Sequence, residues 1–147
     1  MKAEAFIDTN VLLYAVSTDE NEAGKRANAR KILAGSNWGL SIQVLQEFYV
    51  NLIRPSRCVM THADAVAAIN QLLRRPTVSI DAALLIEALR VKHRFQVSYW
   101  DAAIIAAANN LGASVLYSED LNHGQDYGGV KVINPFLPPC DISAHRP

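Results

Sequence analysis

The chain lacks an excess of charge, a cysteine motif and a long apolar run. Its 147 residues carry 14 Lys plus Arg and 14 Asp plus Glu, so no global basic field marks a nucleic-acid partner. Cys58 and Cys140 have no CxxC spacing, which argues against a disulfide framework or a zinc site and for free thiols. No apolar stretch is long enough to span a bilayer, and the N-terminus lacks the apolar core of a signal peptide. We therefore expect a cytoplasmic protein.

Several catalytic signatures are also missing. There is no GxxxxGK[ST] phosphate loop, no GxGxxG and no GxSxG turn, so nucleotide-dependent and serine-nucleophile mechanisms lose their usual markers. The four histidines show neither HxxxH nor HxH spacing. Half of the residues are hydrophobic and 19% are charged, which is typical of an ordinary globular protein and fits a single domain.

Short apolar runs alternate with helical periodicity along the chain. The pattern predicts strands at 3–7, 38–41, 77–80, 113–117 and 130–133, and helices at about 9–16, 21–33, 42–53, 62–75, 82–91 and 99–111. Strands separated by helices imply right-handed crossovers, and hence a parallel sheet with helices on both faces, an α/β class. We expect the domain to cover 1–135 and a Pro-rich tail to cover 136–147.

Two carboxylates come directly after predicted strands. Asp8 follows the first strand, and Asp120 follows the strand at 113–117. In open parallel sheets the carboxyl ends of strands form the edge where ligands bind. Asp8 also fits a helix N-cap, a purely structural role. Asp120 shares its parity with Ser118, so it is favoured over Glu119 to face the same crevice, with Glu119 as the substitute if the strand ends early.

Two further acids lie on predicted helices. Asp101 is the only charged residue of its helix, and Ile104 and Ile105 one turn on predict a buried stripe, where a carboxylate needs a partner or a cation. A capping box with Ser98 is the structural alternative. Glu47 lies on a polar helix face with Arg54, which a solvated surface explains equally well.

Taken in order, these segments resemble the PIN-domain nucleases, above all the small VapC-type toxins of bacterial toxin–antitoxin pairs. The resemblance rests on DTNVLLY at 8–14, the helical Glu47, SYWDAAIIAAA at 98–108 and YSED at 117–120, and it covers nearly the whole chain. It implies a three-layer α/β/α sandwich with a parallel five-stranded sheet of order 3-2-1-4-5. It also implies an acidic pocket of Asp8, Glu47, Asp101 and Asp120, beside which Asn10 and Ser118 would lie.

A cluster of four carboxylates is stable only with protons or cations, and oxygen ligands select Mg²⁺ or Mn²⁺. We expect Asp8, Asp101 and Asp120 as metal ligands, Glu47 as the group that orients or activates water, and Asn10 and Ser118 as supports of the carboxylates. Arg54 and Arg57 are candidates to hold RNA phosphates. The resemblance further implies an RNA substrate, a homodimer and a small antitoxin as partners, with no membrane.

Other assignments remain open at this stage. A haloacid-dehalogenase-type phosphotransferase needs a second acid two residues after Asp8, where the chain has Asn10. A receiver-like domain would accept phosphate on Asp81 with Lys131 as its partner, yet it wants an acid pair after the first strand. A non-catalytic scaffold and a solitary nuclease of RNA processing are the remaining alternatives.

Overall fold

The computed structural model describes residues 2–56 and 59–138 and contains one five-stranded sheet. The strand order is β3-β2-β1-β4-β5, and all four strand pairs are parallel, so the expected topology is confirmed. β2 has the predicted bounds, and the other four strands are shorter than the apolar runs that predicted them. The five strands are β1 Ala5–Ile7, β2 Trp38–Ser41, β3 Thr77–Val78, β4 Val115–Tyr117 and β5 Lys131–Ile133.

The predicted helices are present, and four of them begin after a residue whose side chain caps the first turn. Ser41, Thr61, Asp81 and Ser98 each accept a hydrogen bond from a backbone N–H of the first turn that follows, which satisfies a donor that the helix itself leaves unpaired. The helices are α1 Thr9–Ala15, α2 Ala23–Leu33, α3 Ile42–Ile53, α4 His62–Leu72, α5 Ala82–Phe95 and α6 Tyr99–Leu111, with a short 3₁₀ helix, η1, at Glu20–Glu22.

Several element boundaries differ from the sequence prediction; α4, for example, ends at Leu72 rather than at 75. The start of the helix expected at 21 is the separate η1, capped by the Asp19 side chain. The strand expected at 77–80 stops at Val78, and Ile80 is exposed rather than buried in the sheet. α5 runs to Phe95, beyond the expected end at 91, and closes on Gln96 in the left-handed conformation (φ 55°). Glycine is the usual residue there, so Gln96 gives no stop signal.

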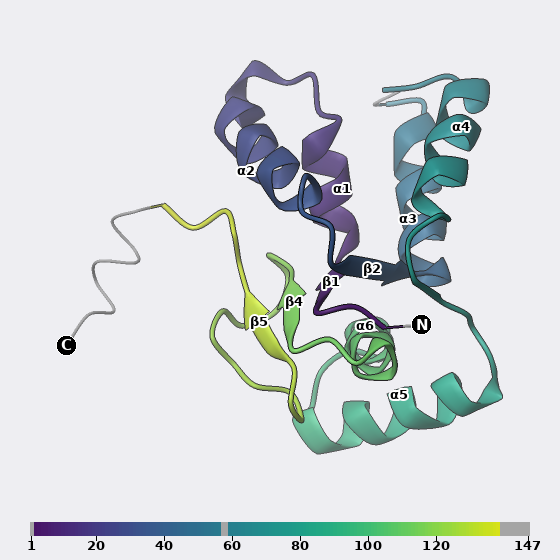
Figure 1. The fold of residues 1–147 in the computed structure, drawn as a ribbon, viewed down its shortest axis with the longest axis vertical. Helices are drawn as coiled ribbons and strands as arrows, with labels where there is room; N and C mark the ends of the chain where they lie inside the picture. Colours follow the sequence, from purple (N-terminus) through teal and green to yellow (C-terminus); the bar gives the residue numbers. More distant parts are fainter. Residues whose placement is uncertain (1, 57–58, 139–147) are drawn as a thin grey trace.

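Helices cover both faces of the sheet. In Figure 1, α5 and α6 lie on the lower right side of the sheet and α1 to α4 lie above it, which gives the three layers of an α/β/α sandwich. α6 is the more deeply buried helix of its layer, because its residues from Ala102 to Ala108 are all buried. A helix that is apolar on nearly every side must be enclosed by other elements.

The contact between α6 and the sheet depends on a glycine in β2. A Cβ on Gly39 would lie 2.5 Å from the carbonyl oxygen of Pro76 and 2.9 Å from the Leu111 side chain at the end of α6. Only glycine lets the backbone approach this closely. Gly39 therefore permits the close contact of β2 with α6.

No helix in the described part of the chain is long and apolar enough to cross a membrane.

Candidate active site

Asp8 links the end of β1 to the start of α1. One carboxylate oxygen accepts from the backbone N–H of Thr9 at 2.7 Å, and the other accepts from the Ser118 hydroxyl at 2.7 Å. Only 6% of Asp8 is exposed, and this burial raises the pKa of its carboxyl to about 7. The two hydrogen bonds lower that pKa, whereas the charges of Asp120 and Glu47 raise it. Asp8 is thus a helix cap and part of an acidic neighbourhood at once.

Glu47 projects from α3 toward the same neighbourhood. Gln43, one turn earlier, donates to its carboxylate at 3.1 Å, and the same amide reaches the carbonyl of Trp100 on α6 at 3.4 Å. Partial burial raises the pKa of Glu47; the Gln43 hydrogen bond lowers it, while the charges of Asp120 and Asp101 raise it. The polar face of α3 therefore points at the other acids.

Asp101 lies in the first turn of α6. Its backbone N–H donates to the Ser98 hydroxyl at 3.1 Å, so the expected cap is present. Ile104 and Ile105 are buried as predicted, while Asp101 itself is half-buried. Partial burial raises the pKa of its carboxyl, with a smaller rise from the charge of Asp120 and an opposing hydrogen bond from Ser98. Asp101, like Asp8, is therefore both part of a helix cap and part of the acidic neighbourhood.

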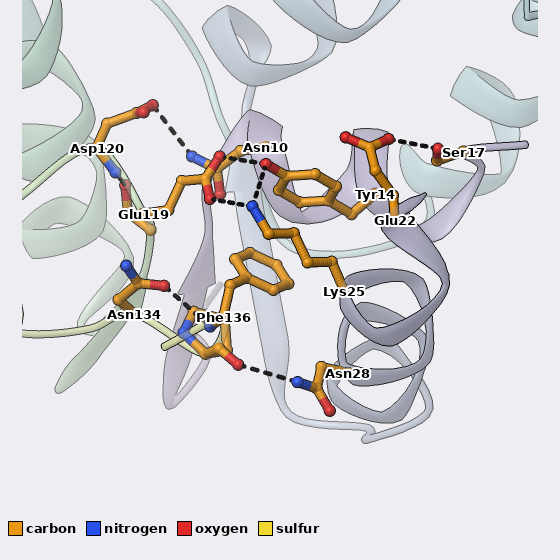
Figure 2. Close-up of polar contacts among 12 residues, drawn as sticks. Asn10, Tyr14, Ser17, Glu22, Lys25, Asn28, Glu119, Asp120, Asn134 and Phe136 are labelled. Carbon is orange, nitrogen blue, oxygen red and sulfur yellow. Dashed lines mark hydrogen bonds and ion pairs between the residues drawn. The ribbon is translucent and has the colours of Figure 1, made fainter. Parts of the chain in front are cut away.

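Asp120 and Glu119 have different partners, although β4 ends at Tyr117 and the expected strand parity therefore does not extend to them. Asp120 accepts from the Asn10 amide at 3.1 Å, and its own N–H donates to the Ser118 hydroxyl at 3.1 Å. Glu119 instead accepts from the Tyr14 hydroxyl at 2.6 Å and forms an ion pair with Lys25 at 3.6 Å. Figure 2 shows the two side chains and their separate contacts on α1 and α2.

Asp8, Glu47, Asp101 and Asp120 are called the acid cluster below. The charge of Asp120 raises the pKa of each of the other three acids, so Asp120 lies within electrostatic reach of them all. Four separate chain segments supply these side chains. In the described residues, the ion pairs join Lys25 to Glu119 and Arg90 to Glu87, and neither pair neutralises the cluster.

The oxygen atoms that the acid cluster offers as metal ligands suit a hard divalent cation. They are all carboxylate oxygens, and the Asn10 Oδ1 beside them is buried without a hydrogen-bond partner. Within residues 2–56 and 59–138, no three Asp, Glu, His or Cys side chains already converge as a metal cage. Mg²⁺ does not require one, since it keeps several waters and uses one or two carboxylates. The residues present therefore fit a hydrated Mg²⁺ or Mn²⁺ ion.

The remaining predicted residues have less to do with the acids. Arg54 is exposed at the C-terminal cap of α3. Arg57, Cys58 and Cys140 lie outside the described residues. The alternative phosphoacceptor Asp81 is used as the N-cap of α5, where it accepts from the Leu84 N–H at 2.8 Å.

Sequence reasoning misses Tyr14 and Lys25. Tyr14 belongs to an apolar run whose pattern indicates core or contact surface, and Lys25 to a charged helix whose pattern indicates a solvated face. The available signal is spacing, because Tyr14 is one helical turn after Asn10. A cavity of about 340 Å³ adjoins the site, and its walls include Asn10, Tyr14, Asn51 and Glu119.

Comparison with known proteins supports the fold. The family model of the PIN domain matches residues 5–125. Among solved structures, VapC20 of Mycobacterium tuberculosis, a toxin that cleaves the sarcin–ricin loop, is 24% identical and has a TM-score of 0.65 over 88% of this chain and 99% of its own. A toxin–antitoxin complex from Klebsiella pneumoniae is 17% identical, with a TM-score of 0.65 over 90% and 98%.

A DNA-bound VapBC complex from Salmonella typhimurium is 16% identical, with a TM-score of 0.62 over 88% of this chain and 96% of the matched chain. At these identities the likeness concerns the fold. No curated protein sequence gives a significant match.

Proposed function

This chain belongs to the PIN domain family, and from that premise we propose that it is a metal-dependent endoribonuclease. One observation carries the proposal. Asp8, Glu47 and Asp101 all lie within electrostatic reach of Asp120, and no ion pair of the described residues neutralises these four carboxylates. Like charges held together in this way are expensive for a purely structural role, so the cluster is best explained by a cation that it binds.

The four acids have different roles in this proposal. Asp8 and Asp101 are the principal metal ligands in this proposal, and Asp120 completes the set directly or through water. A bound Mg²⁺ or Mn²⁺ ion would lower the pKa of a coordinated water and neutralise charge that develops on a phosphodiester. Glu47 would orient the attacking water and accept its proton, because its raised pKa brings it closer to that of a useful base.

Ser118 and Asn10 would keep the carboxylates in place. Ser118 donates to Asp8 and accepts from the Asp120 N–H, so one hydroxyl connects two members of the acid cluster. Asn10 donates to Asp120 from α1. Groups that orient metal ligands in this way raise metal affinity without touching the metal.

RNA is the proposed substrate, and its phosphates need cationic contacts because the acid cluster repels them. Arg54 is exposed at the end of α3, the helix that carries Glu47, and is one candidate. Arg57 remains a candidate on sequence alone. The Arg54→Gln substitution should weaken RNA binding and reduce its salt dependence.

A toxin paired with a small antitoxin is the favoured biological role. The support is structural likeness to toxins and toxin–antitoxin complexes that cover nearly the whole chain. Exposed apolar side chains on α3, α4 and α5 offer surface for an antitoxin or for a second copy in a homodimer; they are Val50, Val66, Leu85, Ile86 and Leu89. A solitary nuclease of RNA processing is the alternative, and a small antitoxin-like reading frame immediately upstream would separate the two.

The test is cleavage of RNA by the purified protein with Mg²⁺ or Mn²⁺. Cleavage should stop in excess EDTA and in the Asp8→Asn and Asp101→Asn variants. Glu87→Gln on α5 is the matched control, because it also removes a carboxylate but lies outside the acid cluster. Equal cleavage in EDTA, or by both aspartate variants, would overturn the mechanism.

A further inference from the structure

Three consecutive residues after β4, Ser118, Glu119 and Asp120, are each held by different partners. Ser118 donates to Asp8 at the end of β1. Glu119 is bound by Tyr14 and Lys25, and Asp120 is bound by Asn10. Figure 2 shows Glu119 and Asp120 at the same turn with their side chains directed to separate contacts. Each of the three side chains in this turn is therefore held by its own contacts.

One face of α1 provides two of these partners. Asn10 and Tyr14 are four residues apart, which places their side chains one above the other on a helix. Asn10 donates to Asp120, and Tyr14 donates to Glu119. α1 thus acts as a two-point clamp on this turn.

The Tyr14 side chain is itself braced from two sides. Lys25 donates to the Tyr14 hydroxyl at 3.1 Å and lies 4.8 Å from the centre of its ring. The Phe136 ring packs edge-to-face against Tyr14 at 4.7 Å, and Figure 2 shows Phe136 beside it. With these supports the hydroxyl is held where it meets Glu119.

The contacts of Asn10 and Tyr14 bear on whether Asp120 or Glu119 is the fourth acid of the cluster. Glu119 and Asp120 lie in a bend just after β4, and their carboxylates are held by different residues, Tyr14 and Asn10 respectively. We propose that Tyr14 is a positioning residue that selects Asp120 over Glu119 as the fourth acid of the cluster, by holding the Glu119 carboxylate against α1 and Lys25. This inference rests on the proposed metal-dependent function of the cluster.

Lys25 has a defined part in this arrangement. Its ammonium group accompanies Glu119, so the positive charge stays beside the clamp and does not pair with the acid cluster. The cluster then keeps its negative charge for a cation. Without the Tyr14 hydroxyl, Glu119 would retain only the longer Lys25 contact and could rotate toward the metal position, displacing Asp120.

The decisive measurement is Mn²⁺ affinity by calorimetry on the full chain, for wild type, Tyr14→Phe, Glu119→Gln and the double variant. Tyr14→Phe keeps the ring that packs on Phe136 but removes the hydroxyl. We expect its Mn²⁺ affinity to fall about 10-fold, the lower end for loss of a group that orients metal ligands. The double variant should return to within about threefold of wild type, because the neutral amide that Glu119→Gln introduces is a poor competitor for a hard cation.

Two controls separate positioning from general damage. Tyr49→Phe removes a hydroxyl with a similar contact, 2.8 Å from Nδ1 of His62, and should leave Mn²⁺ affinity unchanged. Circular dichroism melting verifies that each variant folds. Wild-type affinity in Tyr14→Phe, or a double variant no better than Tyr14→Phe, would overturn the inference. Absence of Mn²⁺ binding in the wild type would instead overturn the proposed function, so the two failures are distinguishable.

Discussion

The Ser118 hydroxyl lies 2.7 Å from the second carboxylate oxygen of Asp8 and joins the residues that follow β4 and β1. The two are 110 positions apart in the sequence, yet their strands are neighbours in the sheet. The bond fixes the orientation of a carboxylate that is almost fully buried. A site of this kind is rigid before any ligand arrives, and its ionisation and its stability are linked.

The pKa of Asp8 predicts a pH-dependent stability. The folded protein holds the Asp8 proton up to about pH 7, whereas an unfolded Asp releases it near 3.8. Between those values the folded state binds more protons, so the free energy of unfolding falls as pH rises and levels off above 7.

Urea denaturation in metal-free buffer measures this effect. Wild type should lose about 2 kcal/mol more than Asp8→Asn between pH 5 and pH 7, at about 1.4 kcal/mol per pH unit for one proton. Asp120 and Glu47, the acids that face Asp8, remain in both proteins, so the difference isolates Asp8. Parallel pH profiles for the two proteins would contradict the prediction.

Divalent cations should counteract that loss. A cation that binds only the folded state adds about 2.7 kcal/mol at 100 times its dissociation constant. At pH 8, Mn²⁺ or Mg²⁺ should therefore raise the melting temperature of wild type, and EDTA should reverse the rise. Asp8→Asn and Asp101→Asn should show little response. An equal rise in these variants would place the cation elsewhere.

Glu47→Gln should separate water activation from metal binding. The Gln43 amide can still donate to the side-chain carbonyl of this variant, so the substituted side chain keeps its place while it loses its basicity. We expect single-turnover cleavage to fall by about 100-fold, as for loss of a general base, with Mn²⁺ affinity within about threefold of wild type. A fall in affinity as large as that of Asp101→Asn would make Glu47 a ligand.

Alanine substitutions at two glycines should have opposite effects on the stability of the fold. Gly39→Ala puts a Cβ 2.5 Å from the Pro76 carbonyl oxygen and should cost about 3 kcal/mol, the upper range for overpacking. Gly24→Ala in α2 meets nothing within 4 Å and should stabilise by about 0.5 kcal/mol through helix propensity. Thermal melts compare the two, and a neutral Gly39→Ala would contradict the close approach of β2 and β3.

Much of the fold can be predicted from the sequence because local signals agree with one another. Thr61, Asp81 and Ser98 mark helix starts, and Gly112 ends α6 in the left-handed conformation. The errors fall where no such signal exists. Gln96 ends α5 in a conformation that its side chain does not favour, and Ile80 looks like a strand residue but is exposed. Tertiary context, not propensity, decides such positions.

The candidate site is predictable to a different degree for each acid. Asp8 and Asp120 follow strands, and the edge where parallel strands end brings them together. Glu47 and Asp101 come from helices, whose rotation about their axes is set by packing that the local pattern does not specify. Tyr14 and Lys25 are missed for the same reason, since their contacts to Glu119 join α1, α2 and the turn after β4.

The origin of the acid cluster in four dispersed segments bears on synthesis of the chain. Its members are residues 8, 47, 101 and 120, and β1 lies between β2 and β4 in the sheet. A nascent chain on the ribosome therefore lacks the complete site until Asp120 has been added and has left the exit tunnel. Whatever chemistry the site performs, it cannot begin until most of the chain has been made.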